Sequence, residues 1–334
     1  MKKNPAISII ILNWNGRKWL KECFFSVCKQ NFKDFEIILA DNNSTDDSVG
    51  LIKELKDSRI KLIENRKNLG FALANNQAAE IARGKYLFFV NNDTKIESRV
   101  LSKLVKEMEE NQNLAICGCK MMNYSGQKHF HTGIGVDIFG YPIFWDIWKK
   151  IFYIEGSALM IRSEIFRKLG GFDPEYFMFH EDIDLAWRAW LLGYQVTALP
   201  SAVIYHFAGG TAGGGEKIKG RYQSSLLRRY YSERNNIRTL LKNYRVSTLL
   251  IILPLYFLIN LVEILFYLVL LRFKVVYLYL KAYLWNLVNL AGTLKKRREV
   301  QRQRVISDRK IISLMYHGSG KLVALKKAGI PRFK

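Results

Sequence analysis

The chain has 334 residues and a formal net charge of +23, with 52 Lys and Arg residues against 29 Asp and Glu residues. This length is enough for a large buried core, and the basic excess indicates an anionic partner such as a phosphorylated substrate, a nucleic acid or an anionic membrane. The four cysteines have neither zinc-binding spacing nor the density of a disulfide-stapled secreted domain, so neither class is expected.

Residues 6–90 alternate between short apolar runs and amphipathic segments. Strands are predicted at 6–12, 35–40, 60–64 and 86–90, with helices at 17–30, 49–56 and 72–82 between them. Regular alternation of this kind is typical of an α/β fold in which helices cover both faces of a parallel sheet. The run 86–90 is apolar throughout, as expected for a strand that is buried on both faces.

Each predicted strand ends in a polar loop, at Asn13, Asp41, Asn68 and Asn91. Because the carboxyl ends of parallel strands share one edge of the sheet, we expect these loops to converge on a binding site. The first loop has one glycine, Gly16, without the Gly-x-Gly-x-x-Gly pattern of a dinucleotide-binding loop, and a Walker loop is absent too. Carboxylates and amides suit the base and ribose of a nucleotide, together with a divalent metal for its phosphates.

Four of these segments resemble the family 2 inverting glycosyltransferases of the GT-A fold, most closely the branch that contains rhamnosyltransferases. The segments are Ser8–Gly16, Asp41–Ser48, Asn68–Asn76 and Phe89–Thr94. The resemblance covers roughly residues 6–245 and implies a Rossmann-like GT-A domain for nucleoside-diphospho-sugars. It also implies inverting transfer of one sugar from a UDP- or dTDP-sugar to a hydroxyl group of a lipid-linked or cell-surface glycan.

The resemblance assigns roles to individual residues. The nucleotide-sugar site would comprise Asn15, Asp41, Asn43, Asn68, Gly70, Phe71, Asn75 and Asn92. Within it, Asp41 would bind the uracil or thymine ring. Asp93 and His206 would hold Mg²⁺ or Mn²⁺ together with two oxygens of the diphosphate.

The second half of the predicted domain is less regular. A helix is predicted at 95–110, strands at 115–122, 154–162, 195–199 and 202–205, and a helix that is capped by Ser163–Glu164. Residues 123–153 are aromatic without clear periodicity, which fits either an acceptor-binding lobe or a hydrophobic cluster under loops. The glycine-rich stretch 209–215 resembles a lid over the donor, and its composition fits a flexible linker equally.

Three acidic residues, Glu181, Asp182 and Asp184, lie together at the start of a predicted helix. The helix dipole alone would account for acids in a first turn. The resemblance identifies this segment as the acceptor-base motif of the family and makes Asp182 the general base, which takes the proton from the acceptor hydroxyl. Asp184 and Arg188 are expected to form an i, i+4 ion pair.

The C-terminal third differs in composition from the rest of the chain. The predicted organisation is a catalytic domain at 1–225, a basic and aromatic closing helix at 226–245, an apolar helical hairpin at 246–294 and a basic tail at 295–334. The stretch 246–271 holds one charge, Glu263, and is long enough to cross a hydrocarbon core of about 30 Å. Because both flanks are basic, we expect the hairpin to re-enter or lie in the membrane from the cytoplasmic side. The alternative is a soluble helical subdomain or a homodimer interface.

The basic tail has 13 Lys and Arg residues against two acidic ones, which favours an anionic membrane surface. No recognisable nucleic-acid-binding motif accompanies it, so no nucleic-acid partner is expected. In the closing helix, Arg234 is expected either near phosphates or on a solvated basic face.

The function predicted from these observations is a metal-dependent glycosyltransferase on the cytoplasmic face of the cell membrane. One alternative is a non-catalytic membrane- or nucleic-acid-binding protein with a degenerate transferase domain. Another is a processive polysaccharide synthase, although the Gln-x-x-Arg-Trp motif of such synthases is absent.

Overall fold

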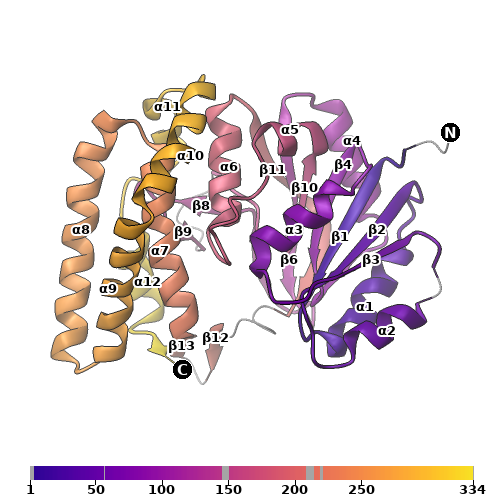
Figure 1. The fold of residues 1–334 in the computed structure, drawn as a ribbon, viewed down its shortest axis with the longest axis horizontal. Helices are drawn as coiled ribbons and strands as arrows, with labels where there is room; N and C mark the ends of the chain where they lie inside the picture. Colours follow the sequence, from indigo (N-terminus) through magenta and orange to yellow (C-terminus); the bar gives the residue numbers. More distant parts are fainter. Residues whose placement is uncertain (1–3, 56, 145–149, 208–213, 219–220, 334) are drawn as a thin grey trace. The chain divides into compact units, whose positions relative to one another are not determined.

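The structure is a computed structural model that describes residues 4–55, 57–144, 150–207, 214–218 and 221–333 (Figure 1). The chain divides into two compact units. The sheet unit comprises Met1–Ile134, Ile151–Ala189 and Tyr194–Thr211, and the helical unit comprises Gly135–Lys150, Trp190–Gly193 and Ala212–Lys334. The sheet unit contains all of the predicted nucleotide and metal residues, and the helical unit contains the predicted apolar helices.

Four parallel strands form one half of the sheet, as predicted. They are β1 (Ile7–Asn13), β2 (Phe35–Asp41), β3 (Ile60–Glu64) and β4 (Tyr86–Asn91), connected by α1 (Arg17–Cys28), α2 (Ser48–Glu54) and α3 (Gly70–Glu80). Asn13 lies opposite Asp41, and Leu12 lies opposite Asn91. Because β1, β2 and β4 end at nearly the same level, the polar loops that follow them lie at one edge of the sheet.

The other half of the sheet is mixed, so the predicted parallel arrangement holds only for the first half. The strand order is β3-β2-β1-β4-β10-β6-β11-β5, with β7 paired to β6. The added strands are β5 (Thr94–Ile96), β6 (Leu114–Asn123), β7 (His129–Thr132), β10 (Ala158–Arg162) and β11 (Gln195–His206). β10 runs antiparallel to β4, with Ala158 opposite Val90. The start of β10 therefore lies at the same edge as the end of β4.

Three local predictions differ from the structure. The helix predicted at 95–110 begins only at Val100 (α4, Val100–Glu110), because residues 94–96 pair with the end of β11. The two strands predicted around Pro200 are one strand, β11, with a register shift between Leu199 and Val203 that accommodates a residue without an N–H group. Ser163 does not cap α5 (Ser163–Lys168), because its hydroxyl donates to the carbonyl oxygen of Gly84 instead.

The central strand β4 is covered on both faces, as its apolar sequence predicts. Every side chain in 86–90 is at most 2% exposed. On one face Phe88 belongs to a core that includes side chains of α1 and α4. On the other, the Phe89 ring packs against Phe166 of α5 and against Phe172, with centroids 5.3 Å and 5.1 Å away. This packing makes β4 a rigid support for the polar residues that follow it.

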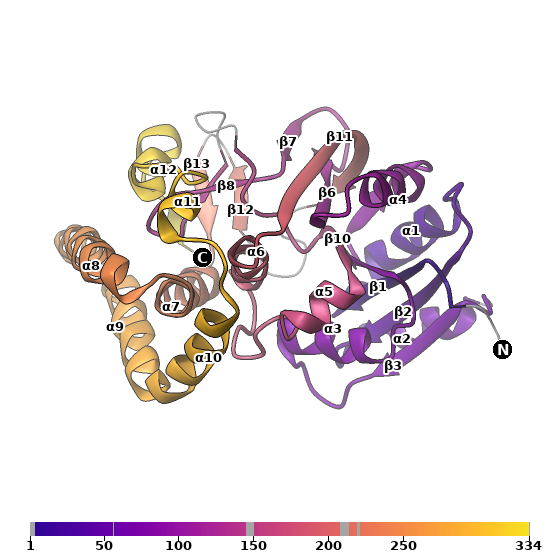
Figure 2. The ribbon, with the colours of Figure 1, turned by 90° about the horizontal axis from the view of Figure 1, so that it is seen from above.

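The helical unit consists mainly of α-helices. They are α7 (Leu226–Asn243), α8 (Val246–Val269), α9 (Phe273–Val288), α10 (Leu290–Gln303), α11 (Asp308–Ile312) and α12 (Gly320–Ala328). Short strands are β8 (Gly135–Val136), β9 (Pro142–Ile143), β12 (Gly214–Ile218), β13 (Arg221–Ser224) and β14 (Arg332–Phe333). Figure 2 looks nearly along the helices and shows α7 flanked by α8, α9 and α10.

Two apolar helices, α8 and α9, occupy the predicted hairpin, and the basic residues that follow continue as helices. Among the described residues, α8 is the helix that is long and apolar enough to cross a membrane. That property rests on length and composition, and the core helix of a soluble protein meets the same criteria. The contacts of α8 within the helical unit therefore indicate better than its hydropathy whether this helix crosses a membrane.

Candidate active site

The carboxylate of Asp41, at the end of β2, is the centre of a buried hydrogen-bond network. Its Oδ1 accepts from the Asn13 amide at 2.8 Å and from the Ser44 hydroxyl at 2.6 Å, and its Oδ2 accepts from the Ser44 N–H at 2.9 Å. The amide of Asn92, after β4, donates to Asn13 Oδ1 at 2.7 Å. The ends of three strands are thus joined through Asn13, a residue that the site prediction did not include.

Asn15 and Asn43 lie in the loops after β1 and β2, and both have left-handed backbones, with φ of 50° and 66°. Asn15 Oδ1 accepts from the Thr45 N–H at 2.7 Å, and the Asn15 N–H donates to the Ser44 hydroxyl at 2.9 Å. Asn15 therefore fastens one loop to the other, whereas the Asn43 side chain is exposed.

The loop before α3 is held by a second pair of asparagines. Asn68 Oδ1 accepts from the Asn42 amide and from the Gly70 N–H, each at 2.8 Å. Gly70 has φ +77°, and a Cβ at this position would lie 2.4 Å from the carbonyl oxygen of Phe177. Glycine is therefore required here by the backbone conformation and by a close approach.

The other two predicted pocket residues have contacts inside the protein. The Phe71 N–H donates to the carbonyl oxygen of Phe177 at 2.6 Å. The Asn75 amide donates to the carbonyl oxygen of Phe71 at 2.9 Å, and Asn75 is 1% exposed. In this structure the Asn75 side chain supports the first turn of α3.

The predicted metal ligands lie together, although 113 residues separate them in the chain. Asp93 Oδ1 and His206 Nε2 are 3.0 Å apart, and both side chains are buried. Burial opposes protonation of His206, but the hydrogen bond and the charge of Asp93 outweigh it, so the pKa of His206 is raised. The Nδ1 atom of His206 is buried without a hydrogen-bond partner among the described residues.

This pair fits a divalent metal ion with few protein ligands. With metal–ligand bonds of about 2.1 Å, neighbouring ligands of an octahedral ion are about 3 Å apart, which matches the 3.0 Å between Asp93 Oδ1 and His206 Nε2. Across the described ranges, no group of three or more His, Cys, Asp and Glu side chains could hold a metal. Asn92 is committed to Asn13, so Asp93 is the member of Asn91–Asn92–Asp93 that faces His206.

Asp182 lies at the start of α6 (Glu181–Leu191) and is tied to the edge of the sheet. Its Oδ1 accepts from the Ile183 N–H at 2.8 Å, and its Oδ2 accepts from the Gly156 N–H at 3.4 Å. Burial and the negative charge of Glu155 raise the pKa of Asp182 to about 7. A carboxylate with such a pKa can accept a proton near neutral pH.

Glu155 lies in the candidate site and was not among the residues predicted from the sequence. Its Oε2 lies 3.2 Å from His131 Nε2, and its charge acts on Asp182. Glu181 adds to this acidic cluster, because burial and the charge of Asp182 raise its pKa well above the usual range. The sequence offers one weak sign of this position. Glu155 is an acidic residue next to Gly156, and an apolar strand begins two residues after that glycine.

The predicted pair of Asp184 and Arg188 is confirmed. Arg188 Nε donates to Asp184 Oδ2 at 2.8 Å, and both residues are buried. Arg188 also donates to the carbonyl oxygens of Leu169 and Gly171, at 2.7 Å and 2.9 Å. The pair therefore fastens the start of α6 to the end of α5.

Three further predictions concern Arg234, the proposed lid and the aromatic stretch that follows the first half of the domain. Arg234 is 6% exposed in the helical unit, and its guanidinium lies 4.3 Å from the centroid of the Trp285 ring, so a solvated basic face is wrong for this residue. The proposed lid, 209–215, lies outside the described residues except for its last two positions. In the aromatic stretch 123–153, residues 145–149 lie outside them as well.

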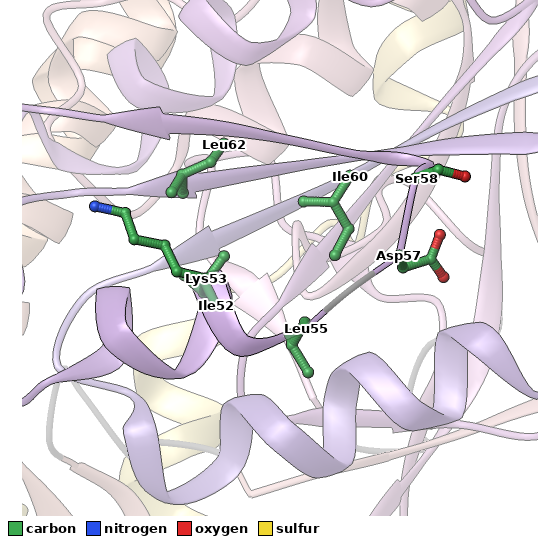
Figure 3. Close-up of a pocket in the computed structure, with 7 residues that line it drawn as sticks. All are labelled: Ile52, Lys53, Leu55, Asp57, Ser58, Ile60 and Leu62. Carbon is green, nitrogen blue, oxygen red and sulfur yellow. The ribbon is translucent and has the colours of Figure 1, made fainter.

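A shallow hollow of about 360 Å³ lies beside the edge strand β3. Figure 3 shows its walls, which come from α2, β3 and the segment between them: Ile52, Lys53, Leu55, Asp57, Ser58, Ile60 and Leu62. None of the predicted nucleotide, metal or base residues lines it. The polar edge of the sheet is therefore the stronger candidate for the active site.

The N-terminal half of the chain matches the model of a known family. Residues 8–170 match the family model described as Glycosyl transferase family 2. The chain is 38% identical over 183 residues to the uncharacterized glycosyltransferase MJ1057 of Methanocaldococcus jannaschii, a match that covers 49% of this chain and 58% of the relative. It is 38% identical over 99 residues to the Escherichia coli UDP-Glc:alpha-D-GlcNAc-diphosphoundecaprenol beta-1,3-glucosyltransferase WfaP, covering 28% of this chain and 39% of WfaP. The chain thus spans less than two thirds of each of these relatives.

Solved structures share the fold. The crystal structure of GalNAc-T7 with UDP, GalNAc and Mn²⁺ has a TM-score of 0.58 at 16% identity, covering 74% of this chain and 49% of that chain. The structure of S. aureus TarS 1-349 with UDP-GlcNAc has a TM-score of 0.52 at 19% identity, covering 71% of this chain and 67% of that chain. These matches confirm the predicted GT-A architecture, and the rhamnosyltransferase branch stays a prediction.

Proposed function

Because residues 8–170 match the model of family 2 glycosyltransferases, we propose that the protein transfers a single sugar from a nucleoside-diphosphate sugar to a hydroxyl group of a lipid-linked or cell-surface glycan. The reaction would be a single displacement with inversion at the anomeric carbon. The observation that carries this proposal is the convergence of three aspartate carboxylates, each with different neighbours, on one edge of the sheet. Asp41 is the last residue of β2, Asp93 follows β4, and Asp182 accepts from the Gly156 N–H just before β10.

Donor binding would begin at Asp41. A carboxylate offers about four lone-pair sites, and three hydrogen bonds to Asp41 are made inside the protein. The remaining site can accept the ring N–H of uracil or thymine. Two relatives in fold were solved with UDP or UDP-GlcNAc, which supports a UDP-sugar as the first donor to test.

The diphosphate would be held at Asp93 and His206 through Mg²⁺ or Mn²⁺. When bound, such an ion neutralises the charge that develops on the leaving diphosphate. The chain's own contribution is to hold the carboxylate and the imidazole 3.0 Å apart in a buried position. GalNAc-T7, a relative in fold, was crystallised with Mn²⁺, which supports including this ion in the assays.

Asp182 would act as the general base. Its carboxylate accepts the proton of the acceptor hydroxyl while that oxygen bonds to the anomeric carbon and the carbon–diphosphate bond breaks. A pKa of about 7 leaves Asp182 partly ionised at neutral pH and makes it a stronger base than an ordinary aspartate. The N–H groups of Ile183 and Gly156 fix the orientation of the carboxylate.

We place the enzyme on the cytoplasmic face of the cell membrane. The name of WfaP specifies a diphosphoundecaprenol acceptor, which supports a lipid-linked acceptor here. The apolar helix α8 supports a membrane location for the chain.

The substitution Asp182→Asn tests the proposal. We expect it to abolish acceptor-dependent release of nucleoside diphosphate while the affinity for UDP-sugar stays within about twofold of the parent, because the group that changes serves proton transfer only. Glu164→Gln, an exposed acid in the first turn of α5, is the matched control and should leave both properties unchanged. Undiminished turnover by Asp182→Asn would remove this residue from the mechanism.

A further inference from the structure

The outer side of α8 and α9 is a continuous apolar surface without a partner among the described residues of the chain. On α8, exposed side chains such as Leu250, Val262 and Val269 are 72%, 61% and 81% exposed. The exposed positions on α9 recur every three or four residues, which is the spacing of one helix face. We call the following set the apolar face: Leu250, Ile251, Leu258, Leu261, Val262, Leu265, Val269, Phe273, Tyr277, Leu280, Leu284 and Leu287.

The opposite side of α8 is bound to the protein through charges. Glu263, the one charged residue of this helix, lies 2.9 Å from Arg229 of α7 and 2.8 Å from Lys321 of α12. Lys321 also donates to Asn260 Oδ1 at 2.7 Å and lies 2.8 Å from Glu233 of α7. A largely buried network of two acids and two bases therefore joins three helices.

These contacts extend along α8. The hydroxyl of Tyr256 donates to Glu233 at 3.2 Å, two turns before Glu263. One turn after it, Arg229 donates to the Tyr267 hydroxyl at 3.4 Å, and the Tyr267 ring packs against Phe333. Over this stretch, α8 has one side fixed to α7 and to the C-terminal residues.

This attachment is incompatible with α8 as an isolated membrane span. If α8 crossed the bilayer, α7 would enter the hydrocarbon with it. The charged residues of α7 are Arg228, Arg229, Glu233, Arg234, Arg238 and Lys242. Each charge at the bilayer centre disfavours insertion by roughly a hundredfold.

Exposed basic side chains flank the helices of the apolar face along the chain. Arg245 precedes α8, Arg272 and Lys274 lie at the turn into α9, and Lys295 and Arg298 follow the apolar part of α10, all exposed. Basic residues beside an apolar surface suit a leaflet with anionic headgroups, where each adds about fivefold to binding. A symmetric pair of chains would bring these like charges together, which disfavours a second copy as the occupant.

We propose that the apolar face of α8 and α9 inserts into one leaflet of an anionic bilayer while the inner side of α8 stays bound to α7 and α12. The chain is then attached from one side and does not span the membrane. This inference rests on the membrane location proposed above and specifies how the attachment is made.

Vesicle flotation tests the surface. The full chain should float with vesicles of phosphatidylcholine and phosphatidylglycerol, and should bind pure phosphatidylcholine more weakly. Leu258→Glu, on the apolar face, should weaken vesicle binding at least tenfold. Ile81→Glu, which changes a 43% exposed residue of the sheet unit, should remain within twofold of the parent. Equal flotation of both variants, with unchanged thermal unfolding, would overturn the proposal.

Accessible cysteines test the topology. Arg272→Cys at the α8–α9 turn is compared with Glu110→Cys, an exposed position of the sheet unit, in membrane vesicles of defined orientation prepared from expressing cells. A membrane-impermeant maleimide should label both positions in inverted vesicles and neither in right-side-out vesicles, after subtraction of labelling in the parent chain. Labelling of position 272 from the opposite side to position 110 would mean a spanning hairpin and would overturn the proposal.

Two further measurements distinguish lipid binding from self-association and from a failure of donor binding. A soluble dimer that Leu258→Glu dissociates, with no vesicle binding by the parent, would assign the apolar face to a second copy and overturn the proposal. Calorimetric binding of UDP to the parent and to Leu258→Glu reports on the sheet unit. If neither binds UDP, the proposed function fails, while the flotation and labelling results still decide the attachment.

Discussion

The pH dependence of transfer is the prediction that follows most directly from the acidic cluster around Asp182. The pKa of Asp182 is about 7, raised by burial and by the charge of Glu155. The base must be ionised to take a proton, so about half of the enzyme is active at pH 7, about a tenth at pH 6 and about a hundredth at pH 5. The rate should therefore rise about tenfold per pH unit below 6.5 and level off above pH 8.

The substitution Glu155→Gln perturbs this profile in a defined direction. It removes the neighbouring negative charge and keeps the size of the side chain, so the pKa of Asp182 should fall and the midpoint should move to lower pH. Burial is the larger cause and stays in place, so the pKa should remain above that of an exposed aspartate. At pH 6, the rate relative to the plateau should increase severalfold.

The assay is acceptor-dependent release of nucleoside diphosphate at saturating donor, measured from pH 5 to pH 9. Glu164→Gln removes an exposed acid and should leave the midpoint where it is in the parent. A parent profile without a midpoint between pH 6 and pH 8 would refute the assignment of Asp182. So would an active Glu155→Gln variant whose midpoint stays unchanged or moves to higher pH.

Three other substitutions test separate parts of the account. Asp93→Ala should abolish the metal dependence of donor binding in calorimetry, and equal donor affinity of the parent with and without EDTA would contradict the metal site. Arg188→Met removes the guanidinium that pairs with the buried carboxylate of Asp184 and should lower the free energy of unfolding by about 3–5 kcal/mol in urea titrations; a change below about 1 kcal/mol would contradict this. Gly70→Ala, at φ +77° with a backbone carbonyl 2.4 Å from the new Cβ, should cost about 1–3 kcal/mol. Gly170→Ala has the same φ without a neighbour within 4 Å and should cost less.

The first half of the fold could be predicted because its signals are local. The apolar run 86–90 and the three preceding strands are each followed by a polar loop, and parallel neighbours then place those loops at one edge. The strand β10 lies within a predicted strand, but its antiparallel direction has no local signal, because its partners β4 and β6 are set by contacts distant in the sequence. The same holds for residues 94–96, which leave a helical pattern to pair with β11.

The candidate site likewise combines residues that could be predicted from the sequence with residues that could not. The proximity of Asp93 and His206, 113 residues apart, was accessible only through the resemblance to a family. Asn13 and Glu155 were missed because their importance comes from neighbours across the sheet, Asp41 in one case and Asp182 in the other. Sequence periodicity reports on burial and says little about which buried polar groups meet.

In the helical unit, too, the sequence did not reveal which charged residues pair with one another. From the sequence, Glu263 is one acid in an apolar segment, which is compatible with a span, a re-entrant hairpin or an interfacial helix. The structure pairs it with Arg229 and Lys321, and that pairing orients the helix. The basic tail, expected only as a source of positive charge, supplies one of the two partners.

The most direct test of the central claim is a calorimetric titration of UDP and dTDP into the full chain, with Mn²⁺, with Mg²⁺ and with EDTA. We expect one nucleoside diphosphate to bind in the presence of a divalent metal. We also expect Asp41→Asn, which replaces one acceptor oxygen with an NH2 donor, to weaken binding at least tenfold while the variant stays folded at the assay temperature. Absence of binding by the parent under every metal condition, or undiminished binding by a folded Asp41→Asn variant, would contradict the proposed donor site.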